Sequence, residues 1–274
     1  MKRFDSFLTN YVFSSPACFC LLFEKFLIHL STHDIQGQTR YYKWSYTETW
    51  EIVPQIMSQF VFDTEERLYR SRSDEENIYN CWVYGYSSEI LLGNSIRLSN
   101  DIIAEQALVS IYEQDTRTGV LYCIQFAQMA LTRKAYIYWE NQRKNSEDIG
   151  GLFSPQPSTS SGNLYAINNP DEVVLGYISA GAQALSERKF IPSGLMKKPS
   201  HVDCDCEERY PLLQENDKAT PFVYLSNSLV PVNYVAVNYS QDLEYLAWHT
   251  PRCCDCRELG GTKTRPIWWP SHHI

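Results

Sequence analysis

The chain has 274 residues, of which 44% are hydrophobic and 14% are aromatic, which is enough apolar surface to exclude a wholly disordered chain. Its 24 Lys and Arg residues are outnumbered by 32 Asp and Glu residues and form no long basic run, which argues against nucleic acid as a partner. No stretch of about 18 apolar residues is uninterrupted, so the sequence predicts no membrane-spanning helix.

The N-terminal segment, residues 1–36, is atypical. Met1-Lys2-Arg3 is basic and apolar residues follow, but polar residues and Pro16 interrupt them, so the segment makes a poor signal peptide. Cys18, which follows Ala17, is a weak candidate for lipidation. We expect residues 1–36 to be either a non-native start or partly disordered, and residues 37–274 to form a β-rich body.

Strands are predicted in the first half of this body, where aromatic and β-branched residues alternate with polar ones. The predicted strands are 40–53, 80–86, 89–92, 107–112 and 120–128. The last two flank the turn sequence Asp115-Thr116-Arg117-Thr118-Gly119, so we expect them to pair with each other as a hairpin.

One short amphipathic helix is predicted from about Thr132 to Lys144. Thr132 is a suitable N-cap, and Ala135, Tyr138 and Trp139 would share one face of the helix. The helix should end before Gly150-Gly151, because glycine terminates helices readily.

The second half of the chain is less regular. Residues 154–162 are rich in proline and serine and predict a loop, and the segments 163–167, 173–180 and 187–191 predict a β meander. Residues 192–243 carry several prolines and predict no element. The fold class is therefore mainly β, with antiparallel sheets in a β-sandwich or barrel-like arrangement and one short helix.

Five of the nine cysteines lie in two short segments near the C-terminus. These are Cys204, Cys206, Cys253, Cys254 and Cys256. Disulfides, a zinc site and unpaired thiols are all possible, but the single residue between the first two cysteines is awkward for zinc. We expect a disulfide between the two segments, closing a loop of roughly 50 residues, with the pairing left open. No cofactor or metal is predicted.

Two further cysteines, Cys81 and Cys123, lie inside predicted strands. A cysteine in such a position is usually a small buried hydrophobic residue. We therefore expect both to be structural.

Motifs for catalysis are missing from the sequence. There is no Gly-x-Ser-x-Gly elbow and no phosphate-binding loop, and the six histidines show no catalytic spacing. We expect a binding or accessory protein rather than an enzyme. One alternative is a surface glycan hydrolase that uses carboxylates such as Glu48 and Glu51, and another is a purely structural surface protein. The sequence identifies no ligand-binding residue.

Several short motifs follow one another from about Thr39 to Trp269. In order, they are Tyr41-Tyr42-Lys43-Trp44, Glu48-Thr49-Trp50-Glu51, Cys81-Trp82, Ala135-Tyr136-Ile137-Tyr138-Trp139, Gly150-Gly151-Leu152-Phe153-Ser154-Pro155-Gln156-Pro157, Gly162-Asn163, Val174-Leu175-Gly176-Tyr177-Ile178-Ser179-Ala180, Cys254-Asp255-Cys256-Arg257, Gly260-Gly261-Thr262 and Pro266-Ile267-Trp268. In this order they resemble the domain-of-unknown-function family 4249 of Bacteroidota outer-membrane lipoproteins.

This resemblance implies an extracytoplasmic protein at the outer-membrane surface, held by a lipid anchor and serving nutrient uptake. It further implies a SusC-type TonB-dependent receptor as partner, and it implies no reaction. The chain lacks a convincing lipid-attachment motif and the leading β-sandwich domain of that family. It therefore resembles an N-terminally truncated member.

Overall fold

The computed structural model divides the chain into two compact units, which are described separately. The first unit is Met1–Glu48, Gly85–Glu113 and Cys123–Phe190, and the second is Thr49–Tyr84, Gln114–Tyr122 and Ile191–Ile274. The structure describes residues 3–11, 25–34, 39–63, 65, 68–112, 115–147, 162–169, 171–193, 204, 208–211, 228–236 and 244–271.

A three-stranded antiparallel sheet forms one layer of the first unit. Its strands, in spatial order, are β1 (Arg3–Tyr11), β2 (Lys25–His33) and β8 (Ile102–Tyr112). Strand β2 lies within the segment 1–36, where the sequence predicted no strand. Its side chains Phe26, Ile28 and Leu30 are buried, so this strand belongs to the core.

A six-stranded sheet forms the second layer. Its main path runs through β10 (Gln183–Leu185), β9 (Leu121–Leu131), β3 (Tyr41–Ile52) and β6 (Cys81–Tyr86), while β7 (Leu91–Asn94) pairs with β3 and β11 (Lys189–Pro192) pairs with β9. Strands β3 and β6 confirm the predictions for 40–53 and 80–86. Strands β7 and β11 overlap the predicted strands 89–92 and 187–191.

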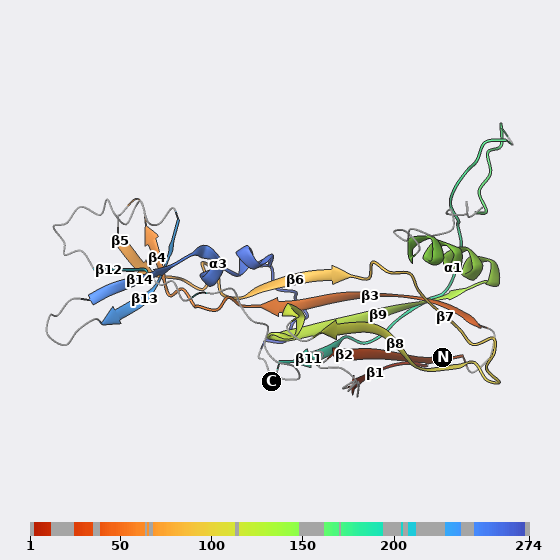
Figure 1. Ribbon diagram of the computed structural model, residues 1–274, viewed down its shortest axis with the longest axis horizontal. Helices are drawn as coiled ribbons and strands as arrows, with labels where there is room; N and C mark the ends of the chain where they lie inside the picture. Colours follow the sequence, from red (N-terminus) through yellow and green to blue (C-terminus); the bar gives the residue numbers. More distant parts are fainter. Residues whose placement is uncertain are drawn as a thin grey trace, which may run out of the picture. The chain divides into compact units, whose positions relative to one another are not determined.

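A buried chain of hydrogen bonds runs within the six-stranded sheet and then crosses from Gln128 to the three-stranded sheet. The indole Nε1 of Trp44 on β3 donates to Gln128 Oε1 on β9 over 2.8 Å, and Gln128 Nε2 donates to Thr32 Oγ1 on β2 over 2.9 Å. Trp44 and Phe126, from neighbouring strands of the six-stranded sheet, are almost completely buried. The two sheets therefore pack face to face (Figure 1), which confirms the mainly β fold class.

The predicted hairpin between 107–112 and 120–128 is wrong, although both segments are strands. Strand β8 pairs with β2, whereas β9 lies between β3 and β10 in the other sheet. The turn between them contains the short 3-10 helix η1 (Thr116–Thr118), which Asp115 caps by accepting a bond from the Arg117 backbone N–H. A turn signal specifies that the chain reverses, but not which strand each arm pairs with.

The predicted helix is confirmed as α1 (Arg133–Glu147). Thr132 Oγ1 accepts a hydrogen bond from the Ala135 backbone N–H over 3.2 Å, as expected of an N-cap. Ala135 and Tyr136 are buried against Leu92 of β7 and Leu131 of β9. Figure 1 shows α1 lying at the end of the sheet where β7 pairs with β3.

The predicted β meander is wrong for its first two strands. Residues 163–167 and 173–180 form no strand. Instead, the Asn163 side chain accepts from the Ile178 backbone N–H over 2.8 Å and donates to the Ile178 carbonyl over 2.7 Å. One side chain thus replaces the backbone ladder that a meander requires. The predicted loop 154–162 lies outside the described residues except for Gly162.

Short elements make up the second unit. They are the antiparallel pair β4 (Phe60–Asp63) and β5 (Leu68–Ser71), the antiparallel sheet β12 (Glu208–Pro211), β14 (Glu244–His249) and β13 (Val230–Ala236), the short helix α3 (Pro251–Cys254) and the 3-10 helix η2 (Cys256–Leu259). Strands β12 and β13 lie in the region 192–243, where no element was predicted, and α3 adds a second helix to the one expected. No helix in the described part of the chain is both long and apolar enough to cross a membrane.

Candidate binding site

A pocket of about 520 Å³ lies beside α1 in the first unit, within the size range typical of small-molecule sites. Its lining residues come from β3, the end of β7, the loop after β7 and the first two turns of α1. They are Tyr41, Asn94, Ile96, Arg97, Arg133, Tyr136, Ile137 and Glu140. The four helix residues have the spacing i, i+3, i+4, i+7, which places them on one face of α1.

Backbone pairing and side-chain bonds hold the sheet side of the pocket in place. Tyr41 and Asn94 are directly opposite each other in the β3–β7 register. Asn94 Nδ2 donates to the Tyr136 hydroxyl over 2.9 Å, and the rings of Tyr41 and Tyr136 are 5.0 Å apart between centroids. These contacts join the sheet to the helix among the residues that line the pocket.

Hydrogen bonds at Ser95 and Leu98 hold the loop that carries Arg97. The Arg40 guanidinium donates to the carbonyls of Ser95 and Leu98, and the Ser95 backbone N–H donates to the Arg40 carbonyl over 3.0 Å. The buried Ser95 hydroxyl donates to the buried carboxylate of Asp101. The loop is therefore preorganised, which reduces the entropy lost when a ligand binds.

Aromatic contacts hold α1 on the sheet next to the pocket. The Lys43 ammonium of β3 lies 3.2 Å from the ring centroid of Trp139, and burial lowers the pKa of Lys43. On the same helix, the Tyr138 ring stacks on Tyr177 with 5.0 Å between centroids. The helix wall of the pocket is thus supported by cation–π and ring contacts as well as by its apolar face.

Positive charge dominates the pocket. Within the described residues, no carboxylate pairs with Arg97 or Arg133. The one acid among the described lining residues, Glu140, lies 3.9 Å from the Lys144 ammonium. Two guanidinium groups are therefore available to a ligand that enters from solvent.

The late cysteines lie in the second unit, where two disulfides join described residues. Cys204 is joined to Cys253, a bond between the two segments for which a disulfide was predicted. Cys256 is joined to Cys81, across 175 residues of sequence. The prediction for Cys81 was therefore incomplete, because this cysteine is buried but disulfide-bonded rather than a lone hydrophobic residue.

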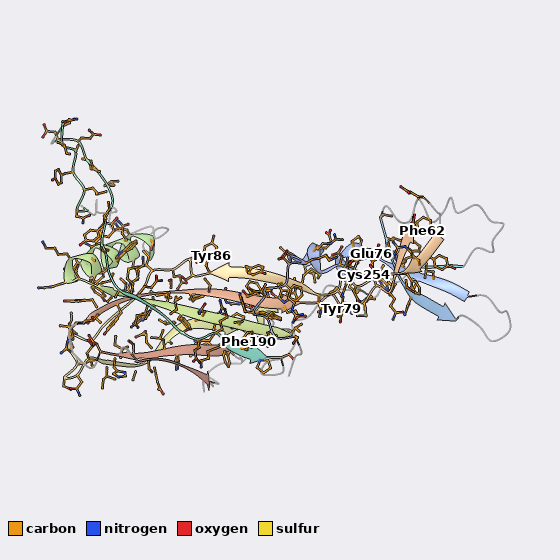
Figure 2. The ribbon with its side chains drawn as sticks, turned by 180° about the vertical axis from the view of Figure 1, so that it is seen from behind. Phe62, Glu76, Tyr79, Tyr86, Phe190 and Cys254 are labelled. Carbon is orange, nitrogen blue, oxygen red and sulfur yellow. A yellow bond between two sulfur atoms is a disulfide. The ribbon has the colours of Figure 1, made fainter. Side chains whose placement is uncertain are left out.

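Two cysteines among the described residues, Cys123 and Cys254, are free and buried. Burial raises the pKa of the Cys123 thiol to about 12, as expected for an inert structural cysteine. Burial likewise raises the pKa of Cys254 to about 12, although the nearby Arg72 guanidinium opposes this shift. Figure 2 labels Cys254, which ends α3. The candidate cysteines Cys18 and Cys206 lie outside the described residues.

The carboxylates of the alternative hydrolase hypothesis do not share a face of β3. Glu48 and Glu51 are three residues apart on this strand, and alternation places them on opposite faces. Glu51 is buried, and it accepts bonds from Asn80 Nδ2 over 2.8 Å and from Trp269 Nε1 over 3.3 Å. Glu48 is also buried, and a Cβ at Gly85 would come within 2.8 Å of its Oε1. Their positions are those of structural carboxylates.

These features define a β-sandwich protein with a disulfide-bonded second unit and a helix-lined pocket. No group of three or more His, Cys, Asp or Glu side chains in the described part of the chain is placed to hold a metal ion. The family model for the domain of unknown function DUF4249 matches residues 8–187, more than half of the chain. The chain therefore belongs to the DUF4249 family. Comparison with curated proteins and with solved structures found no match.

Sequence reasoning missed the pocket. The spacing of Arg133, Tyr136, Ile137 and Glu140 could have indicated a helix face that mixes aromatic and charged residues. No local signal shows that this face meets the loop carrying Arg97, because the two segments are brought together only by the docking of α1 on β7.

Proposed function

We propose that this protein is an extracytoplasmic binding or accessory protein at the outer-membrane surface, and that it is not an enzyme. Its partner in this proposal is a SusC-type TonB-dependent receptor, and its anchor is a lipid. The observation that carries the proposal is the pair of disulfides, Cys81–Cys256 and Cys204–Cys253, in the second unit.

Disulfides of this kind support an oxidising compartment. Structural disulfides persist in secreted and surface proteins, whereas the reducing cytosol keeps most thiols free. The Cys204–Cys253 bond spans 49 residues of sequence, for which chain-entropy models give about 4 kcal/mol of stabilisation. A contribution of that size is a large part of the stability of a small domain, so the second unit should be markedly less stable wherever this disulfide is reduced.

The pocket of the first unit supports binding rather than catalysis. It has a preorganised wall, two unpaired guanidinium groups within the described residues and aromatic rings, which are features of ligand recognition. Glu48 and Glu51 point to opposite faces of β3 and are buried. We therefore place the function in recognition of a ligand, delivered to or held for an uptake system.

Cell fractionation combined with peptide mass spectrometry tests this proposal. Protein purified from cells that produce it naturally, with thiols alkylated at lysis, should yield the cross-linked peptides Cys81–Cys256 and Cys204–Cys253. The same protein should fractionate with the outer membrane and should co-purify with a TonB-dependent receptor. Fully reduced cysteines in protein from the cytosolic fraction would overturn the proposal.

A further inference from the structure

The pocket beside α1 has a charge opposite to that of the chain as a whole. The chain carries a formal net charge of −8, yet its pocket presents Arg97 and Arg133 without a carboxylate partner among the described residues. Guanidinium groups bind carboxylates through paired hydrogen bonds of matching geometry. An anionic group is therefore the ligand feature that the pocket selects.

The start of α1 shows the same preference. A helix N-terminus carries partial positive charge, and acidic residues in the first turn normally stabilise it. The first turn of α1 has no acidic residue and begins with Arg133 and Lys134. This arrangement is unfavourable for the free helix, and conflicts of this kind between local rules and sequence are expected at functional sites. An anion bound beside Arg133 would relieve the repulsion.

The remaining lining residues favour a hydroxylated ring. The ring of Tyr41, which is half-buried, offers an apolar face to the pocket. The ring of Tyr136 is buried, but because its hydroxyl oxygen accepts from Asn94, the hydroxyl proton remains able to donate. The Glu140 carboxylate and the side-chain amide oxygen of Asn94 can accept hydrogen bonds from hydroxyl groups. A simple inorganic anion would leave these groups unused.

We propose that this pocket binds a sugar that carries a carboxylate, such as a uronic acid. The inference rests on the proposed binding function and names the ligand class for it. The carboxylate binds Arg97 and Arg133, the sugar ring lies against Tyr41, and the hydroxyls bond to Asn94 and Glu140.

Titration of the purified full chain with D-glucuronate and D-glucose, followed by calorimetry or NMR, tests this inference. The two sugars differ only in the carboxylate, so glucuronate should bind at least tenfold more tightly. Its binding should weaken as sodium chloride increases, because salt screens the guanidinium groups. Equal affinity for the two sugars, or no binding of glucuronate, would overturn the inference.

Charge-removing variants locate the site. Arg97→Gln and Arg133→Gln should each weaken glucuronate binding at least tenfold, with circular dichroism unchanged. Lys134→Gln is the matched control, since it removes the same charge from the same helical turn but does not line the pocket. Its affinity should equal that of the wild type, and an equal loss in Lys134→Gln would contradict the assignment.

Failure of this inference is distinguishable from failure of the proposed function. Tight binding of glucose without a preference for glucuronate would refute the acidic ligand and leave a binding protein. Absence of the two disulfides in cytosolic protein would refute the extracytoplasmic assignment, whatever the purified chain binds.

Discussion

The two units of this protein are stabilised by different chemistry. In the first unit, the sheets are joined by packed aromatic side chains and by the buried bonds from Trp44 through Gln128 to Thr32. In the second unit, the buried clusters are built around sulfur, with Cys204, Cys253 and Cys254 in one of them. Long alternating strands supply enough apolar surface for a core, whereas short elements need covalent links.

Removal of one disulfide should produce the largest difference in stability between the two units. The double variant Cys204→Ala, Cys253→Ala should lower the free energy of unfolding of the second unit by about 4 kcal/mol. Hydrogen exchange read separately in β14 and in β9 measures the effect in each unit. Protection in β9 should stay unchanged, and an equal loss there would show that the units do not differ as described.

Loss of the buried Gln128 amide should lower the stability of the first unit instead. Gln128→Leu leaves the Trp44 indole N–H without its acceptor, which should cost about 2 kcal/mol. Denaturant unfolding measures this change. Gln106→Leu, on an exposed position of β8, serves as control and should change stability little. A Gln128→Leu variant as stable as this control would mean that the amide bonds contribute nothing.

A pH-dependent contribution is expected in the second unit from Asp255, which caps η2 and bonds to Arg257. Burial raises its pKa, but the bonds from the Arg257 side chain and backbone outweigh burial, so the net shift is downward. A lowered pKa gives stability that is present above the unfolded pKa of about 3.9 and is lost as pH falls through the folded value. Asp255→Asn should therefore cost about 1 kcal/mol at pH 7.

Unfolding curves at several pH values test this expectation. The difference between wild type and Asp255→Asn should shrink below about pH 4, as the wild-type carboxyl becomes protonated. Asp74→Asn makes the same charge change at an exposed position and should show no such trend. A constant difference across this range would argue against the ion pair.

The smallest effect is expected at the start of α1 in the first unit, which carries basic residues. The start of η2 in the second unit carries an acid instead. Arg133→Gln and Lys134→Gln should each stabilise the ligand-free protein by about 0.3 kcal/mol, because they remove positive charge from a helix N-terminus. Thermal unfolding at low salt measures the gain. A loss of stability in both variants would show that these cations have structural partners.

Much of the first unit was predictable because its signals are local. Alternation along residues 40–53 and the N-cap at Thr132 each depend on a few neighbouring residues, and both were confirmed as β3 and α1. The strands in 192–243 were missed because prolines interrupt their pattern. The meander at 163–180 was predicted wrongly, since apolar content resembles a strand even where the segment stays exposed.

The sequence by itself determined the mainly β class, the family and the positions of the longest strands and of α1. Tertiary structure decided that β8 pairs with β2, that Cys256 pairs with Cys81 and that Arg97 and Arg133 line one pocket. The reason is physical: periodicity and capping depend on residues within a few positions, whereas pairing and pockets depend on which distant surfaces pack together.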